Sequence, residues 1–455
     1  MAVLTTYPGV YIEEVPSGVR PIESASTSTA AFIGQTAKGP AEPTLIFKWA
    51  DYVEKFAEEN PTQILQQLSA KAATAAKASA EAKAKAEALA EDPEKVTEAA
   101  EAAEAAKTAK AAAKAATKAL EDAAAGQPCS MWLAVYAFFL NGGGATYIVN
   151  ADNTAGAYDD AFASLEKIRD VSIICLPGKE WNASDKGIIE SAISHAEKMK
   201  NRMVIVDLDA DTKLTSKNDV IGENGLDLSS SAFSVTYYPW VEIANPFHIP
   251  ADPDTGADAV GPATIKVGPS SFAAGMWAKI DGRRGVWKAP AGVETALLGV
   301  AGLADNVDDK QQGELNPVGI NCLRKIPGAG PVIWGSRTLS TMADPEWRYV
   351  PVRRTASMIE ESIYNNIQWA VFEPNDHRLW SSLRVNIDAF MNGLWRAGAF
   401  QGEKASDAYF VRCNLGDTMT QDDIDLGKVI VDVGFAPLKP AEFVIVRIQQ
   451  KVAQQ

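Results

Sequence analysis

Three short apolar segments decide the predicted fold: ATYIVN (145–150), VSIICL (171–176) and MVIVDL (203–208). Helical patterns at residues 158–169 and 186–200 separate them. Strands that alternate with helices in this way predict a parallel sheet with helices packed on it. A strand-like segment at 231–241 and a helix-like segment at 270–280 continue the pattern. We therefore expect an α/β layer in this part of the chain.

Beyond about residue 320 this alternation stops. We predict strands at 332–335, 347–352, 409–414, 429–435 and 442–448, and helices at 354–372 and 375–397. The 375–397 segment carries apolar residues at helical spacing, which is typical of a helix with one buried face. The fold class that we predict is α/β plus α+β in a multidomain chain, because 455 residues exceed one ordinary core.

Residues 61–126 are unusually rich in Ala, Lys and Glu. Asn60, Pro61 and Gln63 form a helix-start signal, and Asp92-Pro93-Glu94 repeats this signal thirty residues later. Gly126 marks the end of the second helix. We expect an antiparallel helical hairpin, peripheral and only modestly stable because alanine buries little area.

The two ends of the chain are β-prone. VYIEEV (10–15) lies between proline and glycine residues, and EFVIVRI (442–448) is nearly continuous apolar sequence. A single strand is not stable alone, and an exposed apolar strand promotes aggregation. Another strand must therefore pair with each end, either within the same chain or in another subunit.

Composition excludes several classes of protein. Acidic residues outnumber basic ones by 58 to 43, which gives a formal charge of −15 and disfavours nucleic-acid binding. The four cysteines are widely spaced, which fits a reducing cytoplasm rather than a zinc or disulfide framework. The amino terminus has no signal-peptide pattern, and the longest apolar run, 131–140, is too short to cross a bilayer. We expect a soluble protein without membrane insertion.

The chain contains the motifs YPGVYIEE (7–14), AFFLNGG (137–143), DGRRGVWKAPAG (281–292) and VIWGSRTL (332–339). Together, and in this order, these motifs resemble the tail sheath family of contractile phages, R-type pyocins and related injection devices. The resemblance fails at the hairpin, where about sixty residues separate segments that the family places close together.

The resemblance implies a structural protein with extended arms that add strands to neighbouring subunits. It implies an N-terminal arm (1–23), an α/β domain (24–60 and 127–320) with a subtilisin-like core (about 150–320), the hairpin insert (61–126), a C-terminal α+β domain (321–440) and a C-terminal arm (441–455). The implied partners are other copies in stacked hexameric rings, an inner tail tube, a baseplate and a tail terminator. The implied location is a virion tail assembled in the host cytoplasm, where contraction drives the tube through the host envelope for genome ejection.

The site residues that we predict are therefore assembly residues. The N-terminal strand comprises Val10, Tyr11, Ile12, Glu13, Glu14 and Val15, and the C-terminal strand comprises Phe443, Val444, Ile445, Val446, Arg447 and Ile448. In the family one helix faces the tube. We assign this role to the 375–397 helix, with Arg378, Arg384 and Arg396 as candidate tube contacts.

Catalytic and ligand sites are not predicted. Ser271, in the segment GPSSFAAG (268–275), and Asp207 resemble parts of a subtilisin triad, but His195, His248 and His377 lack the required context. Ser271 is instead expected at a helix start. The glycines at 142–144 lack a following G-K-[ST], and the acidic loop 252–258 lacks EF-hand spacing. We expect no cofactor and no metal. The alternatives are the sheath of an injection device and, less favoured, a serine hydrolase.

Overall fold

The computed structural model describes residues 20–57, 61–90, 95–126, 129–246, 248, 262–443 and 445. These residues divide into two units. Residues 26–357 and 439–445 belong to the first, which we call the body, and residues 20–25 and 358–438 belong to the second, the C-terminal unit. The chain passes from one unit to the other after residues 25, 357 and 438.

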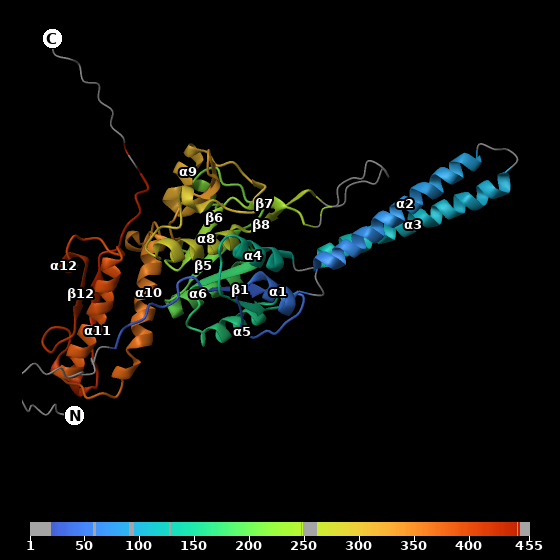
Figure 1. The fold of residues 1–455 in the computed structure, drawn as a ribbon. Coiled ribbons are helices and arrows are strands. Elements are labelled where there is room, and N and C mark those ends of the chain that lie inside the picture. Colours follow the sequence, from blue (N-terminus) through green and yellow to red (C-terminus); the bar gives the residue numbers. More distant parts are fainter. Residues whose placement is uncertain are drawn as a thin grey trace, which may run out of the picture. The chain divides into compact units, whose positions relative to one another are not determined.

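The body is built around an eight-stranded sheet in the order β11-β10-β6-β5-β4-β1-β3-β2 (Figure 1). Its strands are β1 (Ala30–Gly34), β2 (Thr44–Ile46), β3 (Thr146–Asn150), β4 (Ile173–Trp181), β5 (Met203–Leu208), β6 (Ser234–Tyr238), β10 (Ile320–Ile326) and β11 (Gly330–Ile333). The pairings from β10 through to β3 are parallel. The edge strands β2 and β11 pair antiparallel. The predicted parallel α/β layer is confirmed.

Helices cover both faces of this sheet. Helices α4 (Cys129–Leu140) and α8 (Pro269–Arg284) pack on one face, and α5 (Ala155–Leu165) and α6 (Lys186–Met199) pack on the other (Figure 1). Within β1, Phe32 contributes to the core on the α4 and α8 face, whereas Ile33 contributes to the opposite core. This alternation buries both faces of the strand, as is usual for a parallel sheet.

Strand β1 lies between β3 and β4 in the sheet, although the sequence pattern does not predict it. Its sequence, AAFIG, contains three residues that are poor strand formers. Their small size suits a crowded position. A Cβ on Gly34 would lie 3.1 Å from Cε of Met131 and 3.2 Å from the carbonyl oxygen of Pro177. Packing between the layers therefore overrides local propensity.

The remaining elements of the body are short. They are α1 (Trp49–Phe56), α7 (Asn218–Ile221), α9 (Asp309–Leu315), a small sheet of β7 (Val241–Ala244), β8 (Thr264–Val267) and β9 (Gly302–Leu303), and 3-10 turns at Val293–Thr295, Asn316–Val318 and Pro345–Trp347. Strands β10 and β11 belong to the main sheet, where Ile320, Asn321 and Cys322 pair with β6. This differs from the sequence expectation that a separate domain begins at residue 321.

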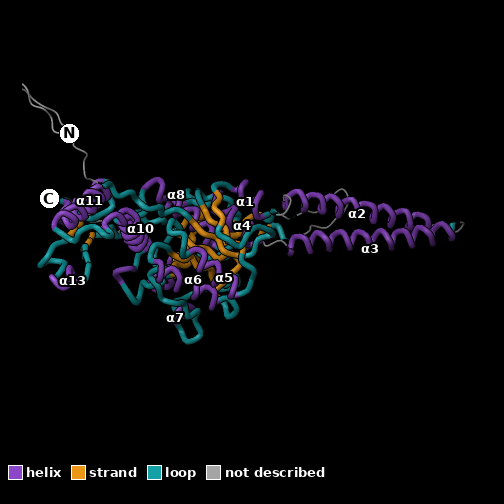
Figure 2. The backbone as a smooth tube through the Cα atoms, turned by 90° about the horizontal axis from the view of Figure 1, so that it is seen from below, coloured by secondary structure: helices purple, strands orange, loops and turns teal. Residues whose placement is uncertain are grey.

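The inserted segment forms the two predicted helices, α2 (Pro61–Ala90) and α3 (Val96–Gly126). They run side by side in both views (Figures 1 and 2). Residues with reduced exposure recur at alternating spacings of three and four, at 68, 72, 75, 79, 82, 86 and 89 in α2 and at 99, 102, 106, 109, 113, 116 and 120 in α3. This is the heptad pattern of a coiled coil, here with alanine at most seam positions.

The C-terminal unit is α+β. Helix α10 (Val350–Asn366) contains the point at which the chain enters it. The unit continues with a 3-10 turn (Gln368–Ala370), α11 (His377–Arg396), α12 (Ala405–Ala408), β12 (Tyr409–Arg412), α13 (Gln421–Asp425) and β13 (Asp432–Phe435), and β12 pairs antiparallel with β13. Asp376 caps α11 by accepting the backbone N–H groups of Arg378 and Leu379. The predicted helix at 375–397 is confirmed.

Two predictions around α10 are wrong. The strand expected at 347–352 is a 3-10 turn followed by the start of α10. The reason is local: Asp344 accepts the N–H of Glu346, and Pro345 favours a helical first turn. The helix expected to continue to residue 372 ends at Asn366. Near the carboxyl end, residues 441–443 and Ile445 form no strand in the single chain.

Candidate assembly site

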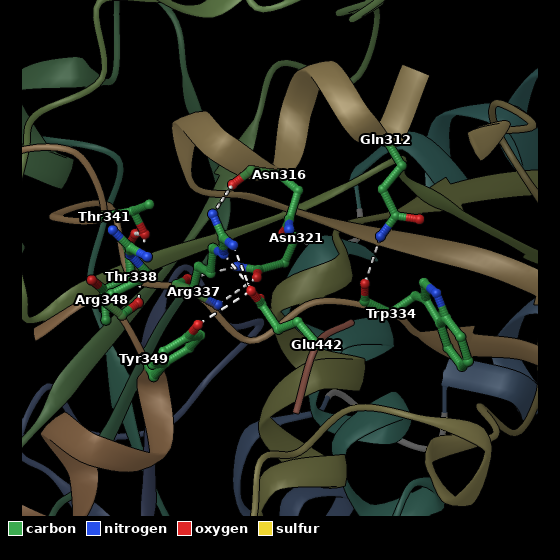
Figure 3. Close-up of polar contacts among 10 residues, drawn as sticks. All are labelled: Gln312, Asn316, Asn321, Trp334, Arg337, Thr338, Thr341, Arg348, Tyr349 and Glu442. Atoms are coloured by element: carbon green, nitrogen blue, oxygen red, sulfur yellow. Dashed lines mark hydrogen bonds and ion pairs between the residues drawn. The ribbon is translucent and has the colours of Figure 1, made fainter. Parts of the chain in front are cut away.

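The described residues at the start of the C-terminal arm are fixed to the body by one ion pair. Arg337 donates from Nε to Oε1 of Glu442 at 2.9 Å and from Nη2 to Oε2 at 2.5 Å (Figure 3). Tyr349 donates its hydroxyl to the same Oε2 at 3.2 Å. The side chains of Arg337 and Glu442 are only 8% and 16% exposed. We call residues 439–442 the C-terminal root.

The position of Arg337 is set by the core of the sheet. Its backbone N–H donates to Oδ1 of Asn321 at 2.6 Å, and Nδ2 of Asn321 donates back to its carbonyl oxygen at 2.8 Å (Figure 3). Asn321 is fully buried on β10. Arg337 also donates from Nη1 to the carbonyl oxygen of Asn316 at 3.1 Å. The backbone of Arg337 is therefore fixed to β10, and its guanidinium binds the carbonyl oxygen of Asn316 as well as Glu442.

Immediately after this ion pair, apolar side chains enter solvent. Phe443 is 76% exposed and Ile445 is 81% exposed. Val444, Val446, Arg447 and Ile448 lie outside the described residues. A fixed anchor followed by exposed large apolar groups is the pattern of a segment that awaits a partner surface.

The described residues at the end of the N-terminal arm contact the C-terminal unit instead. The backbone N–H of Arg20 donates to Oδ1 of Asn386 at 3.1 Å, and its guanidinium lies 4.6 Å from the ring centre of Trp369. The N–H of Ala25 donates to Oγ of Ser362 at 2.8 Å. We call residues 20–25 the N-terminal root. Val10 to Val15 lie outside the described residues.

Next to two of the passages between units, the body contains a buried charge network. Arg354 donates to both carboxylate oxygens of Asp281, at 3.0 and 2.5 Å, and Thr27 donates to the same carboxylate at 2.7 Å. Arg354 also donates to the carbonyl oxygen of Thr27 at 2.8 Å and lies over the ring of Trp277. Both charged side chains are 3% exposed. Burial raises the pKa of Asp281, and Arg354 opposes this shift. One carboxylate thus joins the chain just after residue 25 to the chain just before residue 358.

The three candidate tube contacts lie on α11 but differ in their surroundings. Arg378 and Arg396 are exposed. Arg384 is half-buried and donates to the carbonyl oxygen of Cys413 within the C-terminal unit. Contact with a tube stays a prediction for all three, and Arg378 and Arg396 are the two with exposed side chains.

Asp207 is the aspartate that the serine hydrolase alternative would use. Ser270, rather than Ser271, meets this aspartate: its Oγ donates to Oδ2 at 2.5 Å and its N–H donates to Oδ1 at 2.9 Å. Burial raises the pKa of Asp207 to about 7. His195 instead contacts Arg202, with 3.2 Å between Nε2 and Nη1. Ser271 is buried in the first turn of α8, as predicted, and donates to the carbonyl oxygen of Gly268.

Within the part of the chain that the structure describes, no group of three His, Cys, Asp or Glu side chains is placed to hold a metal ion. Among the same residues, no helix combines the length and apolar character needed to cross a membrane.

Comparison with known proteins identifies the class. Residues 151–339 match the phage tail sheath protein central domain, and residues 342–451 match the phage tail sheath C-terminal domain. The chain belongs to the contractile tail sheath family. Members of this family are structural proteins, and this chain is accordingly not an enzyme.

Individual relatives come from phages and from injection systems. The tail sheath protein of Burkholderia phage BcepMu is 34% identical over 143 residues, which are 30% of this chain and 30% of that protein. The anti-feeding prophage (AFP) helical sheath in its contracted state is 28% identical, with a TM-score of 0.67 and coverage of 98% of this chain and 100% of that one. The sheath of an extracellular contractile injection system (PVC), also contracted, is 27% identical, with a TM-score of 0.65 and coverage of 99% of both chains.

Proposed function

We propose that this chain is the sheath subunit of a contractile tail and that its terminal arms assemble it. Val10 to Val15 and Phe443 to Ile448 add strands to sheets of neighbouring copies. Strand addition gives affinity through backbone hydrogen bonds and register through alternate side chains. The observation that carries the proposal is the C-terminal root, where the Arg337–Glu442 ion pair is followed at once by the exposed side chains of Phe443 and Ile445.

The two roots explain how the subunits of an array can change their packing without dissociating. The N-terminal root contacts the C-terminal unit and the C-terminal root contacts the body, so each unit has its own link to neighbours. Contacts that repeat head to tail without closing produce a helical polymer. Contraction then exchanges one packing of the subunits for another while the paired arms keep them connected.

We also propose for this chain the partners that are typical of the family. The sheath surrounds an inner tail tube as stacked hexameric rings, with α11 and its Arg378 and Arg396 toward the tube. It ends on a baseplate and a tail terminator. The assembled tail forms in the host cytoplasm, and contraction drives the tube through the envelope for genome ejection. A subtilisin-like path for residues 150–320 belongs to the same proposal.

A second candidate is the sheath of an injection device without a genome. The near full-length structural similarity to the AFP and PVC sheaths favours it. The subunit chemistry is the same in both cases. Electron microscopy of purified particles separates them: a capsid on the tail supports the virion, and capsid-free particles support the device.

The arm proposal is tested by truncation. Chains that lack residues 1–19 or 443–455 keep both roots, so we expect them to stay folded by circular dichroism and to remain monomeric in sedimentation. The full chain should form tubes under the same conditions. Tubes formed by either truncated chain would overturn the proposed role of that arm, and loss of folding would show that the arm pairs within its own chain.

A further inference from the structure

Charge is segregated along the inserted hairpin, which the proposed function leaves unexplained. Residues 67–80 and 105–120, which we call the lysine section, contain six lysines and no carboxylate. Residues 81–104, the acidic section, contain eight carboxylates and three lysines. The lysine section is thus a strongly basic region in a chain whose formal charge is −15.

The charged groups of both sections are exposed. The six lysines are Lys71, Lys77, Lys107, Lys110, Lys114 and Lys118, and all lie at exposed positions. Those on α3 recur every three or four residues, which places them along one side of the helix. In the acidic section the described carboxylates, at 81, 87, 98, 101 and 104, are also exposed. Ion pairs within the hairpin are long and solvated, such as Lys107 to Glu104 at 3.9 Å.

The surface between these lysines permits close approach by another helix. Ala111, Ala112, Ala115 and Ala119 are exposed on α3 beside Lys110, Lys114 and Lys118. Short side chains of this kind let a second helix lie near the lysine ammonium groups. A fitting partner is therefore helical and carries carboxylates, and the acidic section of another copy meets both conditions.

We propose that the lysine section of one hairpin docks against the acidic section of the hairpin of a neighbouring copy. This inference rests on the proposed assembly into a sheath. The two sections are centred about 12 residues apart along each helix, so the hairpins are staggered by about 18 Å. Such a contact is head to tail and repeats along a helical array, as the sheath contacts themselves do.

The proposed contact between hairpins is weak, so it acts only between copies that are already part of an array. Exposed ion pairs are individually weak and are screened by salt. They do not hold two free chains together. In an array the arms fix the spacing of neighbouring copies, which gives each contact a high effective concentration. Polyanions such as nucleic acid are disfavoured partners, because the acidic section lies next to the lysine section and the chain as a whole is negative.

Charge reversal in the full chain tests this inference. The lysine variant carries Lys77→Glu, Lys110→Glu and Lys114→Glu, and the acidic variant carries Glu81→Lys, Glu98→Lys and Glu101→Lys. The combined variant restores the net charge of the wild type. Lys and Glu have similar helix propensities, so helix content by circular dichroism should be unchanged. If a charge-reversed chain misfolds, a neutral variant with Lys77→Gln, Lys110→Gln and Lys114→Gln takes its place.

The readout is the critical concentration for polymerisation, measured by sedimentation. At low salt we expect each single set to raise it about fivefold and the Gln set to raise it by about half as much on a logarithmic scale. The combined variant should return to within about twofold of the wild type, and all differences should vanish near 1 M salt.

If the wild type polymerises and none of the variants changes its critical concentration, the inference is overturned and the proposed function is left intact. Failure of the wild type to polymerise would refute the proposed function itself. If the lysine variant loses binding to duplex DNA while its polymerisation is unchanged, the lysine section binds nucleic acid rather than another copy, and the inference is also overturned.

Discussion

The ion pair at the C-terminal root makes a quantitative prediction. Glu442→Gln keeps the shape of the side chain but removes the charge that accepts two hydrogen bonds from Arg337. Hydrogen bonds to charged groups each contribute about 1.5–3 kcal/mol, and breaking a fully buried pair costs about 3–5 kcal/mol. The pair is largely but not completely buried, at 8% and 16% side-chain exposure. We therefore expect Glu442→Gln to lower the free energy of unfolding by about 2–3 kcal/mol.

A double-mutant cycle separates this interaction from other effects of the substitutions. Urea unfolding of the wild type, Glu442→Gln, Arg337→Met and the double variant, each below its critical concentration, should give a coupling energy of about 2 kcal/mol. The matched control is Asp309→Asn, which removes a short ion pair to Arg324, at 2.7 Å, whose aspartate side chain is 94% exposed. That control should leave the unfolding midpoint unchanged. A coupling energy for Arg337 and Glu442 that is indistinguishable from zero would show that the root is not anchored in the free chain.

Three further predictions concern the body and the hairpin. The folded pKa of Asp207, about 7, exceeds its unfolded value near 4, so its contribution to stability is present at low pH and is lost as pH rises toward 7. In the wild type the free energy of unfolding should therefore fall by up to about 4 kcal/mol over this range, and Asp207→Asn should abolish this fall. A pH slope that the substitution leaves unchanged would contradict the assignment. Asp281→Asn leaves the buried Arg354 without its carboxylate and should cost about 3–5 kcal/mol in urea unfolding, whereas a loss below about 1 kcal/mol would show that the network is not a stabilising one. Excision of residues 66–125 with a short linker should leave a chain that still forms tubes visible by negative stain, and an absence of tubes would make the hairpin essential for assembly.

Elements with a strong periodic signal were predictable from sequence. The strand β5 (Met203–Leu208) matches its predicted bounds, and α6 ends within one residue of the prediction, because a continuous apolar run and a regular helical stripe each favour one structure. By contrast, β1 is rich in Ala and Gly, and its place as a strand depends on pairing with β3 and β4 and on close packing at Gly34. The segment 347–352 is strand-like in sequence, but the cap from Asp344 and the proline that follows it determine a helical turn.

The candidate site was less accessible to sequence reasoning. Arg337 and Glu442 are 105 positions apart, and nothing local relates them. The same holds for Asp281 and Arg354, although the sheath-like motif at 281–292 does begin with the aspartate. Sequence indicated which segments are apolar enough to need a partner. It did not indicate where those segments leave the folded units, because this depends on long-range contacts of single charged residues.

The most direct test of the account is a cryo-EM map of tubes formed by the full chain, at a resolution that traces the backbone of residues 10–15 and 443–448. We predict that each segment is a strand hydrogen-bonded to a sheet of a neighbouring copy, with Glu442 still bound to Arg337 of its own chain. Strands that pair within the chain to which they belong, in well-formed tubes, would contradict the central claim.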